Sequence, residues 1–431
     1  MKRGYIDRTE EKCAQSVNEE GYIDRTKEKS ALTVNEQEGS RRMKRDAVIV
    51  AAVRTAIGRQ GGALASVLAH ILGAEVIKEA VRRANIKPET IDDVIFGNVL
   101  SGGGNIARLT ALQTGLSLDL PGLTVDRQCG SGINAVNLAA QAIRAGDGDI
   151  YIAGGTESMS RAPYLMDRPE KPYSPMPPSF RKSQLSPKEV GDPPMGITAE
   201  NLVEKYQITR EEQDEFSLRS QQRMAVAMEE GRFDEQIVPI TIPVRKGEPV
   251  VFKTDEHPRP QTTLEALSKL QPAFLKGGAV TAGNSSGLND AASALVIMSR
   301  EKAEELNLTP LAVIRHYAVA GVDPNIMGIG PVPAVRKVLE KSGLSLAEMD
   351  LIEINEAFAA QVLACNRELE MDLEKVNVNG GAIAHGHPLG ATGAILATKA
   401  VYELKRSGGK YALITACIGG GQGIATILER E

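Results

Sequence analysis

The sequence predicts an α/β protein that consists of two similar halves with a long insertion between them. Short apolar stretches typical of buried strands alternate with longer stretches in which apolar residues recur at helical spacing. This alternation predicts a mostly parallel sheet covered by helices on both faces. The same order of helix, strand, glycine-started helix and glycine-ended strand occurs twice along the chain, and a proline-rich, polar stretch separates the two copies.

Residues 1–42 differ from everything that follows. Residues 4–20 are repeated directly by residues 21–37 with 12 identical positions, and 18 of the first 42 residues are charged. Because so few apolar residues cannot offset the entropy lost on ordering, we expect a flexible, tandem-duplicated extension. The pattern of a folded domain starts at Met43.

The first half, residues 43–160, contains the first copy of the pattern. Residues 46–53 and 91–100 are rich in the apolar residues of buried strands, and they flank a helix at 72–86 whose apolar side chains share one face. A second helix leads to a strand at 149–160 that contains a pair of glycines. This half is expected to hold a nucleophile, for the reasons given below.

Residues 161–289 form the insertion. Prolines crowd its beginning, and a polar helix follows at 209–231, with Thr209 as the capping residue and Glu212 three positions later. A short strand is expected at 237–244. We expect this loop domain to pack on the main body and to shape a site.

The second half, residues 290–431, repeats the first. Residues 333–359 parallel 74–100, and residues 386–421 parallel 129–158. Duplicated units of this kind normally pack face to face, so equivalent loops lie on one side. Residues far apart in the sequence can therefore share one cleft.

Composition narrows the class of protein. A net charge of −5 gives no reason to expect nucleic acid or an anionic membrane as partner, and no apolar run approaches the length of a membrane span. The four cysteines lie far apart without a CxxC pair, which predicts a reducing, cytoplasmic location rather than a disulfide framework. Two histidines, His385 and His387, could ligate a metal, but no HExxH motif or Cys/His cluster supports this.

Cys129 is the candidate nucleophile. It precedes Gly130, Ser131 and Gly132 and then a helix, so its sulfur is expected near unpaired N–H groups and the positive end of the helix dipole. That environment favours the thiolate, which is the reactive form. The alternative, a small buried core cysteine, is about equally compatible with the local sequence.

Three further positions carry reactive or polar residues at predicted strand or helix junctions, and glycine lies near two of them, His387 and Cys417. His387, at the start of the helix equivalent to the one after Cys129, is the candidate base. Asn355 could orient a water or a histidine, or cap the helix that follows. Cys417 precedes the glycines of 419–421, whose N–H groups could bind an oxyanion. This glycine run lacks the lysine of a phosphate-binding loop, which argues against a nucleotide site.

These positions lie in motifs that resemble the thiolases, the acetyl-CoA C-acyltransferases, over essentially all of residues 43–431. The motifs are DRQCGSG (126–132), AGGTESMS (153–160), TAGNSSGLNDAA (281–292), NEAFA (355–359), NGGAIAHGHPLGATG (379–393) and CIGGGQG (417–423). The resemblance implies a five-layer αβαβα fold with an inserted loop domain. It also implies reversible thiolysis of 3-ketoacyl-CoA, with CoA and acyl-CoA as substrates and no permanently bound cofactor, in a homodimer or homotetramer.

The resemblance further implies a role for each matched residue. Cys129 carries the acyl group, and His387 deprotonates Cys129 or the incoming CoA thiol. Cys417 moves the proton on the α-carbon of acetyl-CoA. Asn355 holds a water that forms one oxyanion hole with His387, and the N–H groups of Cys129 and Gly419 form the other.

The same resemblance predicts contacts to CoA and points to differences from the family. Ser286 is expected beside the pantetheine and Arg259 near the adenine, and Ala282 is a further expected CoA contact. Arg259 could equally be an ordinary surface cation. Pro194 stands where acetoacetyl-specific relatives commonly carry histidine, and His385 stands where an apolar residue is usual. These differences bear on acyl-chain preference rather than on the reaction.

Three other classes of protein are less compatible with the sequence. A ketoacyl synthase would carry a histidine in place of Asn355 and would lack Cys417. A papain-like protease has a different chain order of cysteine, histidine and asparagine. A catalytically silent CoA- or lipid-binding relative remains the alternative function, and the presence of all four catalytic-type residues argues against it.

Overall fold

The structure is a computed structural model that describes residues 45–169, 171, 179–244 and 247–431. The expected flexible extension, residues 1–42, lies outside the described residues. Residues 45–431 form a compact unit of their own.

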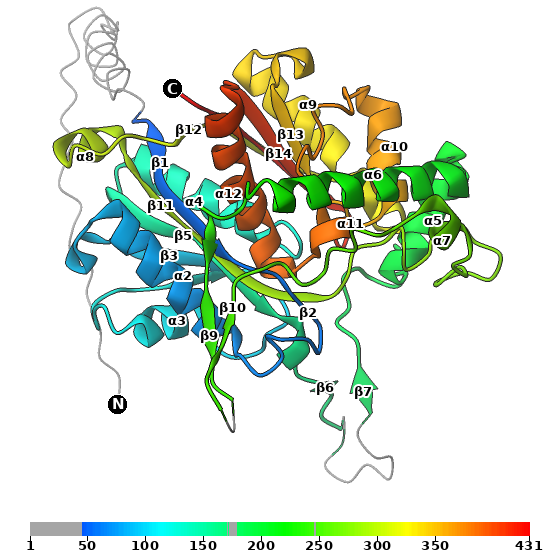
Figure 1. Cartoon of the computed structure of the whole chain (residues 1–431), viewed down its shortest axis with the longest axis horizontal. Helices are drawn as coiled ribbons and strands as arrows, with labels where there is room; N and C mark the ends of the chain where they lie inside the picture. Colours follow the sequence, from blue (N-terminus) through cyan, green and yellow to red (C-terminus); the bar gives the residue numbers. More distant parts are fainter. Residues whose placement is uncertain (1–44, 170, 172–178, 245–246) are drawn as a thin grey trace, which may run out of the picture. The chain divides into compact units, whose positions relative to one another are not determined.

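A mixed sheet forms the centre of this unit (Figure 1). Its main path runs in the order β13 (Leu351–Ile354), β14 (Tyr411–Ile418), β15 (Gln422–Glu429), β12 (Ala312–Gly321), β1 (Ala47–Thr55), β11 (Asn289–Ser299), β5 (Ile150–Ser158), β3 (Asp93–Gly97) and β4 (Leu123–Val125). Two short strands, β2 (Gly58–Arg59) and β8 (Ile237–Val238), pair with β11 and β1 off this path. The first four strands of the path belong to the second half of the chain, and β1 joins them to β11, β5, β3 and β4 through a short ladder with β12.

The expectation of a mostly parallel sheet is wrong. Among the pairs of the main path, only β13–β14, β5–β3 and β3–β4 are parallel, whereas the pairs from β14 to β5 are antiparallel. The reason is that each half closes with a strand that turns back on its neighbour. In the second half this is a tight turn after β14, where Gly420 and Gly421 both have φ 85°, a conformation that favours glycine.

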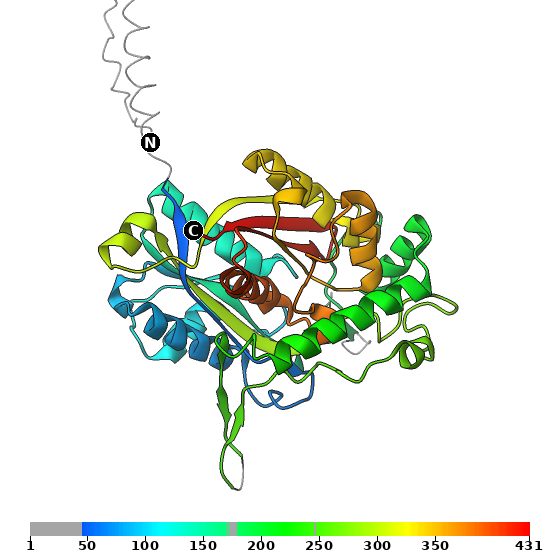
Figure 2. The ribbon, with the colours of Figure 1, turned by 45° about the horizontal axis from the view of Figure 1, so that its top comes forward.

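Helices and sheet alternate in five layers, as expected. The outer layer of the first half is α2 (Ala69–Ala84) and α3 (Ile106–Thr114), and that of the second half is α9 (Pro331–Ser342) and α10 (Ala359–Leu369). Two helices, α4 (Ser131–Ala145) and α12 (Leu389–Ser407), pack against each other between the two parts of the sheet (Figure 2). Three separate apolar clusters fill the spaces between the layers.

The position of a helix explains its composition. The outer helix α2 buries one face, through residues such as Leu72, Val76 and Ile77. The central helix α12 is buried along most of its circumference, and small residues such as Gly390, Ala391 and Gly393 fill its first turns. These small residues permit a close approach to the neighbouring central helix.

The approach of α4 and α12 depends on two glycines that face each other. A methyl carbon added at Gly132 would lie 2.6 Å from the Ala394 amide nitrogen, and one added at Gly393 would lie 2.2 Å from the Ile133 amide nitrogen. Both distances are shorter than any side chain tolerates. The first turns of the two central helices therefore touch backbone to backbone, and this contact fixes where both helices begin.

The segment between β5 and β11 contains most of the remaining elements. They are β6 (Leu165–Met166), β7 (Phe180–Arg181), α5 (Met195–Tyr206), α6 (Arg210–Glu229), β8, β9 (Ile240–Ile242), β10 (Val250–Phe252) and α7 (Leu264–Ser268). The expected capping box of α6 is present, with Thr209 and Glu212 bonded to each other's backbone. The strand expected at 237–244 is divided into β8 and β9, and Pro239 lies between them.

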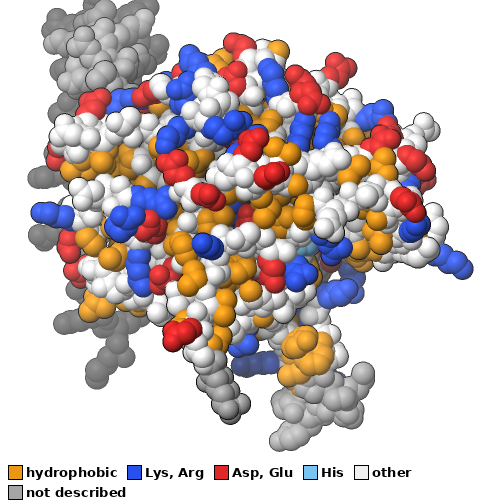
Figure 3. All heavy atoms as spheres, viewed as in Figure 1, with side chains coloured by type: hydrophobic (Ala, Val, Ile, Leu, Met, Phe, Trp, Pro, Cys, Tyr) orange, Lys and Arg blue, Asp and Glu red, His pale blue; other side chains and the backbone are white. Residues whose placement is uncertain are grey.

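A buried ion pair ties this segment to the sheet. Arg54 of β1 donates from Nη1 and Nη2 to the two carboxylate oxygens of Asp255, at 2.8 and 2.9 Å, and both side chains are about 1% exposed. Asp255 also accepts from the Ile57 amide at 2.8 Å. The face shown in Figure 3 carries positive and negative side chains interspersed rather than a field of one sign. Within the described ranges, every helix is too short or too polar to cross a membrane.

Candidate active site

A strained turn holds Cys129 just before α4. Gln128 has φ 46°, a left-handed conformation that is uncommon for a residue other than glycine. The Ser131 hydroxyl accepts from the Arg127 amide at 2.9 Å and donates to the Gln128 carbonyl at 2.6 Å. Strain of this kind persists where the surroundings fix a functional position. Sequence analysis found the glycines beside Cys129 but not this turn.

The sulfur of Cys129 is not poised as a thiolate. Burial raises the pKa of Cys129 to about 11, although the Gly419 amide, bonded to the sulfur, lowers it. The expectation that the helix start favours the thiolate is therefore wrong for the free enzyme. A helix N-terminus stabilises a nearby thiolate by roughly 0.3–1 kcal/mol, which lowers the pKa by less than one unit. Burial opposes it and can raise the pKa by several units. A base is needed to activate this thiol.

Cys417 lies at the end of β14 and is fully buried. It packs in an apolar cluster with residues that include Met195, Ala357 and Phe358. Burial raises the pKa of Cys417 well above its usual value, and the charge of a Cys129 thiolate would raise it further. Cys417 is therefore a protonated thiol that interacts electrostatically with the first cysteine. The structure brings Cys129, Cys417 and Gly419 together.

Contacts at both ends of the residue hold His387. Its amide donates to Asn289 Oδ1 at 2.9 Å, and its ring Nδ1 lies 2.7 Å from Thr392 Oγ1. The Thr392 hydroxyl donates its one proton to the Pro388 carbonyl at 3.0 Å, so it must accept from Nδ1–H. This assigns the tautomer that leaves Nε2 without a proton, and Nε2 is then the atom that can accept one.

Asn355 lies on the Nε2 side of the ring. Its Nδ2 donates to His387 Nε2 over 3.3 Å, a long hydrogen bond, and burial lowers the pKa of His387 to about 4. The alternative that Asn355 caps a helix is wrong, because the capping position of α10 is Phe358. Among the described residues, Asn355 Oδ1 has no hydrogen-bond partner although the side chain is fully buried.

The duplication places the nucleophile and the base at equivalent positions. Cys129 stands two residues before the first residue of α4, and His387 stands two residues before the first residue of α12. The contact between Gly132 and Gly393 brings these two helix starts together. As expected, residues from the two halves meet in one region.

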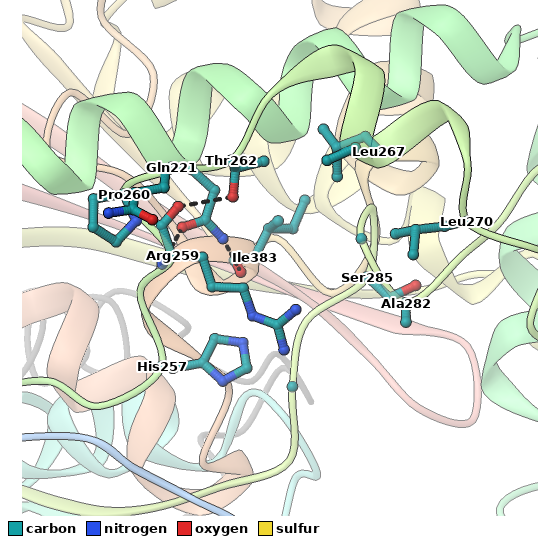
Figure 4. Close-up of a pocket in the computed structure, with 14 residues that line it drawn as sticks. Gln221, His257, Arg259, Pro260, Thr262, Leu267, Leu270, Ala282, Ser285 and Ile383 are labelled. Atoms are coloured by element: carbon teal, nitrogen blue, oxygen red, sulfur yellow. Dashed lines mark hydrogen bonds between the residues drawn. The ribbon is translucent and has the colours of Figure 1, made fainter.

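A cavity of about 590 Å³ lies along the segment that precedes β11 (Figure 4). Two of the residues expected to contact CoA, Arg259 and Ala282, line it. Ser286 does not line it, whereas Ser285 and Gly287 on either side do. The Ser286 amide instead donates to the Ala357 carbonyl at 3.0 Å, next to the candidate catalytic residues.

Sequence analysis missed His257, which faces this cavity. Figure 4 shows the Arg259 guanidinium extending toward the His257 ring. Burial and then the charges of Arg259 and Arg59 lower the pKa of His257 to about 4, so the ring is neutral. His257 precedes Arg259, a candidate CoA contact, by two residues. This proximity is the one feature of the sequence that could have indicated His257 as a cavity residue.

Three further supporting residues were missed. Asn289 and Thr392 fix His387, and Glu157 accepts from the Gly390 amide at the start of α12 at 2.9 Å. All three lie inside the motifs that sequence analysis listed, but no spacing rule distinguishes a supporting residue from a catalytic one. The structure identifies them through their hydrogen bonds.

The fold and the site define an α/β enzyme with a duplicated core and a cysteine-centred site where the halves meet. Comparison with protein families agrees with this description. A model of the thiolase N-terminal domain matches residues 47–301, and a model of the thiolase C-terminal domain matches residues 308–430. The chain therefore belongs to the thiolase family.

Individual relatives are similar over nearly their whole length. An acetyl-CoA acetyltransferase of Syntrophomonas wolfei is 51% identical over 399 residues, which cover 90% of this chain and 100% of the relative. The crystal structure of the Bacillus anthracis acetyl-CoA acetyltransferase superimposes with a TM-score of 0.87 at 48% identity, covering 90% of this chain and 99% of that one. Human mitochondrial 3-ketoacyl-CoA thiolase, solved in complex with CoA, gives a TM-score of 0.84 at 46% identity, with 90% and 98% covered.

Proposed function

We propose that this chain catalyses the reversible thiolysis of 3-ketoacyl-CoA, and the reverse condensation of acetyl-CoA, through an acyl thioester on Cys129. The enzyme class is that of the family: a thiolase, an acyltransferase that acts on CoA thioesters. The observation that carries the assignment of residues is a pair of protonated thiols, Cys129 and Cys417, that interact electrostatically, with the Gly419 amide bonded to the Cys129 sulfur. A simple cysteine hydrolase has no need for the second thiol.

In the first step, the Cys129 sulfur attacks the 3-keto carbon while its proton passes to His387 Nε2. Because burial raises the pKa of Cys129 and lowers that of His387, a thiolate–imidazolium pair is unfavourable before substrate reacts. Proton transfer therefore accompanies formation of the sulfur–carbon bond. The oxyanion that results is stabilised by the amides of Cys129 and Gly419.

In the second step, the bond between the α- and β-carbons breaks and acetyl-CoA leaves as an enolate. Cys417 gives its proton to the α-carbon. A thiol with a raised pKa suits this task because it arrives protonated. The imidazolium of His387 then returns its proton to the Cys417 thiolate, which makes His387 a base again. As the CoA sulfur attacks the acyl group, the CoA thiol proton passes to His387 Nε2 and from there to the departing Cys129 sulfur, so that the shortened acyl-CoA is released and both cysteines are thiols again.

Asn355 supports a second oxyanion site, for the thioester enolate. An unpartnered buried amide oxygen costs on the order of 1–3 kcal/mol, and a water bonded to Asn355 Oδ1 would remove this cost. That water could donate to the enolate oxygen together with a protonated His387 Nε2. This proposal uses the one orphaned oxygen atom beside the candidate base within the described residues.

CoA is a substrate in this scheme, and we propose no resident cofactor. The cavity lined by Arg259 and Ala282 has a volume within the range of small-molecule sites, roughly 300–1,000 Å³. The guanidinium of Arg259 offers a partner for the nucleotide end of CoA. Ser286 lies one residue from the lining residues Ser285 and Gly287, and we propose that it contacts the pantetheine of CoA.

We also propose the organisation of the chain. Residues 43–160 and 290–431 are the two catalytic halves, and residues 161–289 are the loop domain that binds CoA. Deleting residues 1–42 should leave kcat/KM and Tm unchanged, since the family match starts at residue 47. A loss of most activity would contradict this.

Assembly and location are further parts of the proposal. Exposed leucines on α3 and on the edge strand β4, Leu109, Leu112 and Leu123, support a homodimer or homotetramer. Sedimentation equilibrium would distinguish these from a monomer. The described cysteines are all free, which fits the reducing cytoplasm.

The first test is acylation of Cys129. Acetyl-CoA alone should acetylate the peptide that contains Cys129, as measured by mass spectrometry after proteolysis. His387→Ala should slow this acylation by about 10²–10⁴-fold, the usual contribution of a general base. Label on Cys365 or Cys417 instead of Cys129 would overturn the assignment.

The second test separates the two cysteines and excludes a silent CoA-binding protein. Cys417→Ala should keep acetyl exchange between acetyl-CoA and CoA within about tenfold, and should lose thiolysis by at least about 10²-fold. Exchange of the acetyl-CoA methyl protons with deuterated water should disappear. Cys365→Ala is the matched control, since Cys365 is an equally buried cysteine bonded to the Gly328 carbonyl. If all three activities fall together in Cys417→Ala, Cys417 supports Cys129 and is not the acid.

A further inference from the structure

His385 is buried beside the candidate base and is not used in the proposed reaction. It ends the short helix α11 (Ala382–His385) and is 2% exposed. Its Nδ1 lies 2.9 Å from the Gly386 carbonyl oxygen, and its Nε2 lies 3.5 Å from Lys399 Nζ. A carbonyl only accepts and an ammonium only donates, so Nδ1 carries the proton and Nε2 is bare.

Lys399 fixes this tautomer. Its side chain is 1% exposed, and its ammonium donates to Glu353 Oε2 at 2.9 Å and to the Gly380 carbonyl at 2.7 Å. The third ammonium proton is left for His385 Nε2. Burial, and then the Lys399 charge, lower the pKa of His385 well below its ordinary value, with smaller contributions from Arg54 and His257. The ring is therefore a neutral donor with one fixed direction.

Gly386, whose carbonyl oxygen accepts the hydrogen bond from His385 Nδ1, is a backbone position with unusual conformational freedom next to the candidate base, His387. Its φ is 101°, and a methyl carbon added there would lie 2.3 Å from Asn289 Cγ, so the position requires glycine. Glycine also gives the peptide that joins it to His387 the widest freedom to rotate. Two side chains hold that peptide: His385 binds its carbonyl and Asn289 Oδ1 binds its N–H at 2.9 Å.

We infer that His385 is a positioning residue, which fixes the Gly386–His387 peptide through its Nδ1–H and so holds the His387 ring in its catalytic orientation. The inference rests on the proposed role of His387 as the base. No bond is made or broken by His385 itself. Catalytic groups must be held to within about 0.5 Å, and a misplacement of about 1 Å costs on the order of 10²-fold in rate.

Two isosteric replacements separate the two contacts of the ring. Asparagine places a donor where Nδ1 lies and loses the contact to Lys399, whereas glutamine places an acceptor where Nε2 lies and loses the contact to Gly386. His385→Asn should keep kcat for thiolysis within about threefold, and His385→Gln and His385→Leu should lower it by about 10–10²-fold, with KM little changed. His385→Gln should nevertheless melt at the same temperature as His385→Asn or above it, because it keeps the bond to the buried ammonium.

A second readout does not depend on the reaction. Native-state amide hydrogen exchange of the peptide covering residues 382–388 should accelerate in His385→Gln and His385→Leu and stay near wild type in His385→Asn. A purely structural role would instead make activity, exchange and Tm change in parallel. The opposite ranking of activity and Tm in the asparagine and glutamine variants is the expected signature.

Each other outcome overturns the inference. Equal activity and equal amide exchange in all variants would show that the hydrogen bond from His385 Nδ1 to the Gly386 carbonyl is not needed to hold His387. Activity lost in His385→Asn but kept in His385→Gln would assign the effect to Lys399. If wild-type protein lacks thiolase activity, the proposed function fails. The exchange measurement still decides whether His385 fixes the peptide.

Discussion

The spacing between the candidate nucleophile and base depends on the glycine contact between α4 and α12, and Gly393→Ala tests this directly. The added methyl carbon would start 2.2 Å from the Ile133 amide nitrogen, whereas ordinary contact begins at 3.4 Å. The helices must therefore separate by about 1.2 Å unless the backbone deforms. Gly132→Ala, which starts at 2.6 Å from the Ala394 nitrogen, requires about 0.8 Å. These estimates take the van der Waals limit as rigid, as close-packed interiors nearly are.

The expected effect on stability is modest, because two effects oppose each other. Overpacking costs about 1–3 kcal/mol, and replacing glycine by alanine in a helix recovers about 1 kcal/mol. The net loss of about 0–2 kcal/mol should lower Tm by no more than several degrees. The effect on catalysis should be larger: about 10²-fold in kcat/KM for Gly393→Ala, and a smaller loss for Gly132→Ala, because the separation is smaller.

The assay is steady-state thiolysis of acetoacetyl-CoA, with Tm measured on the same samples. Gly104→Ala is the matched control, because a methyl carbon there meets nothing within 4 Å. It should keep wild-type activity. The reasoning fails if Gly393→Ala keeps kcat/KM within about twofold, or if Gly132→Ala is the more damaged of the two variants.

Two further predictions concern charge. The pKa of His387 and of His257 is about 4 in the folded chain and ordinarily about 6.5, so the unfolded chain binds more protons between these values and stability falls as pH falls from 6.5 to 4. In urea unfolding, the free energy of unfolding should change with pH by up to about 1.4 kcal/mol per pH unit for each histidine. This pH dependence should be reduced in His387→Gln and in His257→Gln. An unchanged pH dependence in both variants would contradict the assignment. Arg54→Met should lower the free energy of unfolding, measured in urea, by about 3–5 kcal/mol, because it leaves the buried Asp255 carboxylate without its ion-pair partner. Arg59→Ala, which removes the more exposed ion pair with Glu256, should lower it by less than about 1 kcal/mol. Similar losses in the two variants would refute the anchoring role of Arg54.

Much of the fold could be predicted from the sequence because apolar periodicity and the repeat report local structure and packing together. The two halves and the capping box of α6 follow from these signals, whereas the five layers were implied by the resemblance to the thiolases. Strand direction did not follow. Whether β15 runs back beside β14 depends on a turn of a few residues, Gly419–Gly421. The alternation of helices and strands along the sequence does not reveal such a turn.

The candidate site shows the same division. Cys129, His387, Asn355 and Cys417 could be found because each stands at a predicted strand or helix junction, and glycine lies near three of them, Cys129, His387 and Cys417. The pKa of Cys129 was predicted with the wrong sign because a helix start is visible in the sequence and burial of a sulfur is not. Side-chain partners made across the fold, such as Thr392 and Asn289, also have no sequence signal of their own.

The raised pKa values of Cys129 and Cys417 have a consequence for the durability of the enzyme. Peroxide and electrophiles attack thiolates, and susceptibility follows both thiolate character and access. Because its pKa is raised to about 11, the Cys129 sulfur is predominantly a thiol at neutral pH in the absence of substrate. The raised pKa that makes the nucleophile depend on a base therefore also lowers its reactivity toward peroxide between turnovers.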